Sequence, residues 1–190
     1  MPLISKRRWL YCASLIVALS GCVAAGMANS DKPDLAAAIR DIVDHGQLDD
    51  YKYVAQRLGI NITAGPLETL SDPVTHNYRG DRMEFFTDES ITARFSVIPK
   101  NYHYGVSRAM GRRKYRGVLS IYNLGPKSCI DEVSMFKAFG AARPFPNPDA
   151  PAKIFRYFIK REESYELNVV FEPVGAKCAT SFSLFQNRLN

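Results

Sequence analysis

Apolar residues recur at helical spacing from residue 35 onward. Leu35, Ile39, Ile42 and Val43 follow intervals of three and four positions, and Gly46 comes shortly after them. This spacing puts the side chains on one face of an α-helix, and glycine commonly follows a helix. A helix that ends at Gly46 is therefore expected.

A second helix is expected directly after the first, from about residue 48 to residue 57. Asp49 or Asp50 can accept hydrogen bonds from its first free N–H groups, and Leu58-Gly59 marks its end. Two short helices joined by so few residues predict an antiparallel helical hairpin.

Strand-like segments follow a long loop. Proline and glycine interrupt residues 60–80, so we expect at most one short strand there, at residues 60–62. Further strands are predicted at residues 82–86, 91–98 and 117–122. Apolar and polar residues alternate in segments 93–97 and 118–122, as they do in an antiparallel strand with one buried face.

The second half of the chain begins again with a helix. It is expected at residues 131–138 and should end at Phe139-Gly140, with strands to follow at residues 153–161, 165–172 and 180–186. The chain is therefore predicted to have an α+β fold, in which a helical hairpin and a further helix pack on an antiparallel sheet.

The two halves are similar enough to suggest an internal repeat. Leu58-Gly59 corresponds to Phe139-Gly140 at the end of a helix. Residues 82–86, 95–99 and 119–123 match residues 154–158, 169–173 and 182–187 in pattern. These matches predict two helix-plus-three-strand repeats, at 33–124 and 125–190. The offset between matched residues changes along the chain, which leaves coincidence open as the alternative.

The first residues have the layout of a signal peptide. Lys6, Arg7 and Arg8 precede an apolar run at residues 9–19. The run is shorter than the roughly 20 residues that a bilayer span needs. Residues 1–21 are therefore predicted to be a signal peptide that takes no part in the fold.

The end of this leader resembles the lipobox of bacterial lipoproteins. In Leu19-Ser20-Gly21-Cys22 a branched apolar residue and two small ones precede a cysteine, which in lipoproteins becomes lipidated and N-terminal. The resemblance implies a lipid anchor on Cys22, a spacer at residues 22–32 and a single domain at residues 33–190. Val23, in place of Asp, implies an outer-membrane location facing the periplasm. Cleavage at Ala28 is the alternative, and it would release a soluble periplasmic or secreted protein.

The net charge of the processed chain is small. Of the 25 basic residues, 22 remain without the leader, against 19 acidic residues. This excess is too mild to indicate a nucleic-acid partner, and no nucleic-acid-binding motif is present.

Two cysteines remain once the leader and the lipid are accounted for. Cys12 leaves with the leader and Cys22 is assigned to the anchor, so Cys129 and Cys178 are left. In an oxidising compartment we expect a disulfide between them. Metal ligation and a redox pair are the other options, but no CxxC spacing or neighbouring His or Asp cluster supports either.

The order of elements resembles a known repeat unit. A helix that ends in Leu-Gly or Phe-Gly, a variable loop and three antiparallel strands form the repeat of the β-lactamase-inhibitor-protein-like fold, which small outer-membrane lipoproteins of the SmpA/OmlA group share. The chain lacks the Gly-Met motif that usually starts the first helix of those lipoproteins. The resemblance covers most of the processed chain. It implies a non-enzymatic module that binds a protein with the concave face of its sheet.

The most distinctive stretch is residues 100–116, which is aromatic and basic and contains no acidic residue. Tyrosine and arginine are enriched at binding hot spots. The alternative is a solvated basic loop that keeps a strand edge from pairing. We predict a partner-binding surface made of Tyr102, His103, Tyr104, Arg108, Arg112, Arg113, Lys114 and Arg116.

Catalytic motifs are not found. The chain has no GxSxG elbow, HExxH motif, P-loop or dinucleotide turn, and neither a cofactor nor a metal is expected. The sequence predicts an exported envelope lipoprotein that binds another envelope or exported protein, such as an inhibitor or immunity protein. One alternative is a structural or assembly lipoprotein of the outer membrane. Another is a cell-envelope hydrolase, with His103 and a nearby carboxylate as acid and base. The oligomeric state is left open.

Overall fold

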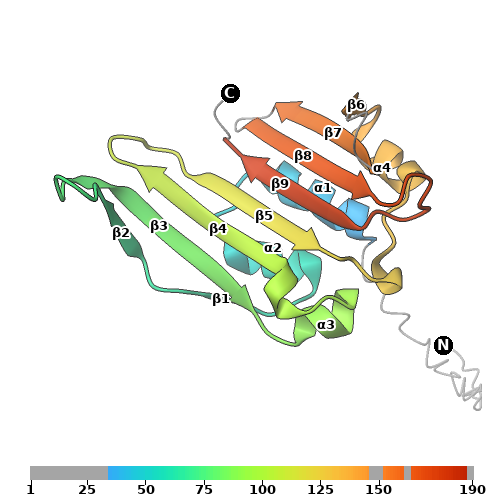
Figure 1. Cartoon of the computed structure of the whole chain (residues 1–190), viewed down its shortest axis with the longest axis horizontal. Helices are drawn as coiled ribbons and strands as arrows, with labels where there is room; N and C mark the ends of the chain where they lie inside the picture. The colour runs from blue at the N-terminus through green and yellow to red at the C-terminus, as the bar shows by residue number, and fades with distance from the viewer. Residues whose placement is uncertain (1–33, 146–151, 161–163, 188–190) are drawn as a thin grey trace, which may run out of the picture. The chain divides into compact units, whose positions relative to one another are not determined.

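The structure is a computed structural model, and it describes residues 34–145, 152–160 and 164–187. These residues contain four α-helices and a nine-stranded sheet in which every strand pairing is antiparallel (Figure 1). The predicted α+β fold is therefore confirmed. The predicted signal peptide, Cys22 and the spacer lie outside the described residues.

The helical hairpin forms as predicted. Helix α1 (Leu35–His45) buries one apolar face and ends at Gly46, whose φ of 85° is favourable for glycine. Helix α2 (Tyr51–Leu58) begins after Asp50, which accepts a hydrogen bond from the Tyr53 N–H at 3.1 Å. The second helix starts three residues later than predicted because residue 48 lies in the connection, where its side chain is fully buried.

The strands run in a single sheet whose order is β1-β3-β4-β5-β9-β8-β7-β6, with β2 also paired to β3. The strands are β1 (Ile62–Ala64), β2 (Glu68–Ser71), β3 (Tyr78–Thr87), β4 (Tyr102–Ala109), β5 (Arg116–Tyr122), β6 (Arg143–Phe145), β7 (Lys153–Lys160), β8 (Ser164–Phe171) and β9 (Ser181–Gln186). The pairing of β5 with β9 joins the strands of the first half to those of the second.

The helices cover one face of the sheet. Tyr104, Leu119, Leu167 and Leu184, on four neighbouring strands, are at most 1% exposed and share a core with Ile39 of α1. Their neighbours along each strand point to the opposite face, because side chains alternate. In Figure 1 this opposite face is turned toward the viewer, and α1 and α2 lie behind the sheet. We call it the open face.

One predicted strand, at residues 91–98, is wrong. The segment forms helix α3 (Ser90–Phe95), followed by Ser96 in the left-handed conformation. Ile91 and Phe95 are both fully buried. Residues four apart share a face of a helix as well as a face of a strand, so the spacing alone did not separate the two.

Two loop predictions also need correction. Residues 60–80 contain β1, β2 and the start of β3 rather than at most one short strand. Residues 100–116 contain strand β4, where only a connection was expected. Its inward residues Tyr104 and Val106 are buried, while polar residues alternate with them on the open face.

The second half agrees with the prediction except for strand β6, which forms at residues 143–145 where a proline-rich loop was expected. Helix α4 (Glu132–Phe139) is followed by β7, β8 and β9 close to the expected positions. The internal repeat stays a prediction, and one of its four matches is wrong. Residues 95–99 lie at the end of α3 and beyond it, whereas residues 169–173 include the end of β8.

The predicted disulfide between Cys129 and Cys178 is present, with a Cα–Cα distance of 4.9 Å. Cys129 follows a short 3₁₀ helix, Pro126–Ser128, and Cys178 lies between β8 and β9. Beside the bridge the Ala179 N–H donates to the Ile130 carbonyl at 2.8 Å. The bond therefore ties the connection before α4 to the β8–β9 connection.

Asp88 links the start of α3 to the segment before β1, and this link should be sensitive to acid. Its carboxylate accepts hydrogen bonds from the Ser90 N–H and the Asn61 side-chain amide, both at 2.8 Å. Hydrogen bonds from Ser90 and Asn61 lower the pKa of Asp88 to about 2 from its ordinary value of 3.8.

Because the pKa is lowered on folding, the carboxylate stabilises the fold above pH 4, and this stabilisation is lost as the pH falls through about 2. Asp88→Asn should therefore lower the melting temperature much more at pH 7 than at pH 2, where part of the wild-type carboxylate is already protonated. Thermal unfolding at both pH values measures this, with the exposed neighbour Glu89→Gln as control. An equal loss at both pH values would contradict the assignment.

Candidate binding site on the open sheet face

The predicted binding surface is divided by the sheet, and its two tyrosines lie on the covered side. Tyr104 is 1% exposed, and its hydroxyl donates to the Leu48 carbonyl. Burial raises the pKa of this hydroxyl, so it stays a donor. The Tyr102 hydroxyl is buried too and has no hydrogen-bond partner among the described residues. Including Tyr104 in a partner-binding surface was therefore wrong, because no partner can reach it.

Arg108 is held by a neighbouring acidic group. Its guanidinium lies 3.2 Å from the Asp81 carboxylate and 5.1 Å from the centre of the Tyr115 ring. Asp81 also accepts a hydrogen bond from the Tyr78 hydroxyl at 2.8 Å. The hydrogen bond to Asp81 raises the pKa of Arg108. This residue serves first to join β3 to β4.

Three of the predicted residues form the exposed turn between β4 and β5. Arg112, Arg113 and Lys114 are exposed there, next to Met110, which is 65% exposed. The turn includes Gly111 at a φ of 73°. The turn therefore presents a basic end with an apolar side chain beside it.

The remaining two residues, His103 and Arg116, lie on the open face and line one pocket. Its cavity volume is about 350 Å³, and it spans β3, β4, β5 and β9. We call it the Gly105 pocket. The lining residues are Arg82, Glu84, His103, Gly105, Val106, Ser107, Arg116, Gly117, Val118, Phe185 and Gln186.

The hollow exists because one strand lacks a side chain. In the strand register Glu84 pairs with Gly105, Gly105 with Val118, and Val118 with Phe185. The row crosses four strands, and Gly105 leaves a gap in its middle. Glycine within a strand often marks such a close approach. A Cβ at this position would lie 3.3 Å from the Met83 carbonyl and would begin to fill the pocket.

The charges in the Gly105 pocket are only partly compensated. Arg82 lies 2.8 Å from Glu68 and 3.7 Å from Glu84, and the hydrogen bond with Glu68 raises its pKa. The side chains of His103 and Arg116 are exposed and form no ion pair or hydrogen bond within the described part of the chain. Val118 and Phe185 give the pocket an apolar wall. The site therefore offers unpaired donors beside an apolar surface.

Several residues of this pocket were not predicted from the sequence. Arg82 and Glu84 lay in a predicted strand, and Phe185 lay in another, far along the chain. The alternation along those strands could have indicated them. Side chains alternate between the two faces of a strand, so the residues between the buried apolar ones lie on the open face. The pairing of β5 with β9 was the missing information.

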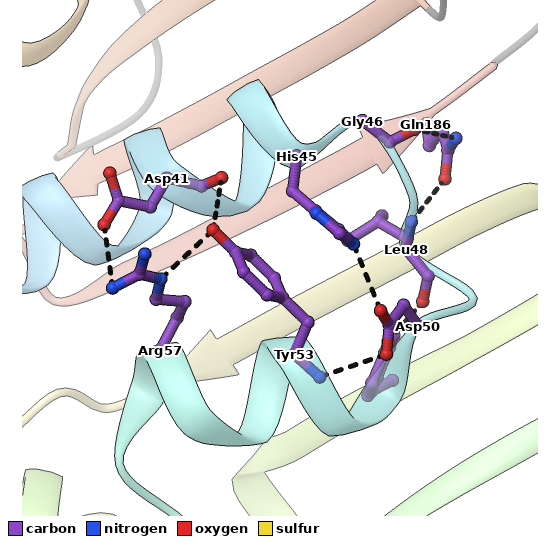
Figure 2. A network of polar contacts seen from close by, with 9 residues as sticks. Asp41, His45, Gly46, Leu48, Asp50, Tyr53, Arg57 and Gln186 are labelled. Carbon is purple, nitrogen blue, oxygen red and sulfur yellow. Dashed lines mark hydrogen bonds and ion pairs between the residues drawn. The ribbon is translucent and has the colours of Figure 1, made fainter.

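A second polar cluster joins the two helices of the hairpin (Figure 2). His45 lies 3.1 Å from Asp50 and stacks on Tyr53 with ring centres 3.8 Å apart. Arg57 donates to the Tyr53 hydroxyl at 3.1 Å and lies 3.5 Å from Asp41. Each polar group has a partner within the cluster. We therefore assign it to holding α1 against α2.

Gln186 fixes the connection between these helices to the sheet. Its side chain accepts from the Leu48 N–H at 2.9 Å and donates to the Gly46 carbonyl at 3.1 Å (Figure 2). The Leu48 carbonyl accepts from Tyr104. Both backbone groups of Leu48 are thus bonded to residues of the sheet, which explains how a buried loop residue is tolerated.

The open face does not present an acid–base pair with His103. Glu84 lines the same pocket but is paired with Arg82. His103 makes no hydrogen bond to a carboxylate within the described residues.

Comparisons of the chain with protein-family models, curated proteins and solved structures found no match. In residues 34–145, 152–160 and 164–187, no helix is long and apolar enough to cross a membrane, and no three His, Cys, Asp or Glu side chains gather as a metal site.

Proposed function

We propose that this protein is an exported, lipid-anchored module of a bacterial envelope that binds another protein with the open face of its sheet. One observation supports this most. The face without helices carries a pocket in which His103 and Arg116 are unpaired beside an apolar wall.

The exposure of this sheet face does not by itself indicate a binding site. An antiparallel sheet commonly has one face in water, and that face is then polar. Here the open face combines Phe185 and Val118 with the unpaired side chains of His103 and Arg116 around a hollow. Binding at such a site costs less desolvation free energy than binding at a flat polar face, because removing its apolar wall from water is favourable. The resemblance to the β-lactamase-inhibitor-protein-like fold implies the same mode, with a sheet face as the interface.

The location forms part of the proposal. A lipid on Cys22 and a spacer at residues 22–32 would hold the domain beside the outer membrane, facing the periplasm. The Cys129–Cys178 disulfide suits this compartment, because disulfides persist where conditions are oxidising. Radioactive fatty acid should label the protein and not its Cys22→Ala variant. Equal labelling of both proteins would contradict an anchor on Cys22, and no labelling of either would favour release after cleavage at Ala28.

Two roles fit this binding mode, inhibition of a toxin or hydrolase and assembly of the outer membrane. The first is favoured by the compact Gly105 pocket, which suits one specific partner. A deletion strain separates the roles. Loss of an inhibitor should matter only when its target is present, whereas loss of an assembly factor should raise outer-membrane permeability in every condition.

Charge reversal on the open side should reduce recovery of the partner. Arg113→Glu with Arg116→Glu should lower capture from envelope extracts about tenfold, because opposite charges across an interface then become like charges. Lys52→Glu with Lys137→Glu makes the same charge change on the exposed sides of α2 and α4. Quantitative mass spectrometry of the captured proteins measures both. A partner lost equally from both variants, or from neither, would contradict the proposed surface.

A further inference from the structure

We infer that the Gly105 pocket receives one bulky apolar side chain from an extended segment of the partner, and that this segment carries Asp or Glu two positions away. The inference rests on the proposed function, since it names the chemistry that the open face would recognise.

The size of the pocket points to a single side chain. A cavity of about 350 Å³ is near the lower end of pockets that hold small ligands, which run from about 300 to 1,000 Å³. Its floor is the backbone at Gly105, and its wall is formed by Val118 and Phe185. A protruding aromatic or branched side chain would fill it and could pack against the Phe185 ring.

The charge at the pocket is uneven along the strands. Near Gly105 the guanidinium of Arg82 is shared by two carboxylates, Glu68 at 2.8 Å and Glu84 at 3.7 Å, so no positive charge is left over there. Two residues further along β4, Ser107 pairs with Arg116 across the sheet. Arg116 has no ion-pair partner within the described residues. The exposed Arg112 and Arg113 lie in the turn of the same hairpin, just before Arg116. The uncompensated positive charge therefore lies at the Arg116 end.

The strand repeat sets the spacing of the motif. Gly105 and Ser107 lie on the same face, and two residues of a strand advance about 7 Å. An extended segment on this face has the same two-residue repeat. A residue seated over Gly105 therefore places the residue two positions away beside Arg116, where a carboxylate can make two parallel hydrogen bonds with the guanidinium.

A random dodecapeptide phage library is the probe. It is selected against the full-length protein in detergent, and enriched peptides are synthesised with a fluorescent label for titration. We expect the enriched sequences to share a bulky apolar residue with Asp or Glu two positions away. Arg116→Glu should weaken their binding at least tenfold, and Lys52→Glu should leave it unchanged.

Filling or removing the apolar site supplies the second test. Gly105→Val should weaken binding at least tenfold by occupying the pocket. Its new Cβ lies tightly against the Met83 carbonyl, so Phe185→Ala, which removes the wall without adding bulk, serves where Gly105→Val does not fold. Circular dichroism checks the fold of each variant.

Three outcomes would overturn the inference: no enriched sequence, enriched sequences without acidic residues, or equal binding by the wild type and by both pocket variants. These failures leave the proposed function standing if the partner still cross-links to the open face. If no partner contacts the open face, the proposed function fails with it.

Discussion

Replacing Cys129 and Cys178 together by serine is expected to lower the free energy of unfolding by about 4 kcal/mol. The two cysteines are 49 positions apart in the chain, so the bond restricts a long loop in the unfolded state. Neither cysteine is buried, and serine should fit both positions without strain. The loss should therefore come mainly from the freedom that the unfolded chain regains.

Urea unfolding of the oxidised wild type and the double variant measures this loss. The reduced wild type is the matched control and should unfold like the variant. The β8–β9 connection depends on the bond most directly, because the bond ties it to the segment before α4 together with the Ala179–Ile130 and Leu124–Thr180 hydrogen bonds. A variant within about 1 kcal/mol of the oxidised wild type would show that the bond does little for stability.

Leu48→Ala is expected to cost about 2–5 kcal/mol, the range for removal of a buried leucine side chain. Leu48 is fully buried, although it lies in the connection between α1 and α2. It packs over Gly117 of β5, where an added Cβ would meet the Leu48 Cβ at 2.8 Å and its Cδ1 at 2.9 Å. Gly117→Ala should therefore cost about 1–3 kcal/mol by overpacking.

The combined variant tests whether these two residues truly share one space. The cost of Leu48→Ala with Gly117→Ala should fall short of the sum of the single costs by at least about 0.5 kcal/mol, because Leu48→Ala removes the Cδ1 that the new methyl group would meet at 2.9 Å, while the Cβ contact at 2.8 Å stays. Urea unfolding of all four proteins gives the coupling. Additive costs would mean that the hairpin connection does not pack on β5 as described.

The helices could be predicted because their signals are local. The apolar residues of α1 repeat at helical spacing, and Gly46 and Gly59 end the two helices of the hairpin in the left-handed conformation. Segment 117–122 was also clear, since its apolar residues Leu119 and Ile121 are buried on one face, although Ser120 is buried as well. In each case neighbouring residues alone decide the structure.

The errors arise where local patterns are ambiguous. Ile91 and Phe95 fit one face of a strand as well as one face of a helix. The hydrogen bonds of Asp88 to the start of α3 and the left-handed Ser96 favour the helix. Strand β4 was not predicted because its many basic and polar side chains obscured the alternation that buries Tyr104 and Val106.

The candidate site was found only in part for a similar reason. His103 and Arg116 were predicted as members of a basic stretch, and the structure places both at the Gly105 pocket. The composition of residues 100–116 gave no indication that the Tyr104 side chain lies on the covered face, since that depends on which alternate residues of the strand face the core. Phe185 could not be assigned because its position depends on the pairing of β5 with β9, whose partner residues are 59 to 69 positions apart in the chain.

Site-specific photo-cross-linking in the native host tests the central claim most directly. A photoreactive amino acid is placed at His103, Ser107 or Tyr122 on the open face, or at the exposed helix positions Lys52, Gln56 or Lys137. The open-face positions should give adducts of one common mass after irradiation, and the helix positions should give none. Adducts from the helix positions, or no adduct from the open face, would contradict the proposal that the open face binds the partner.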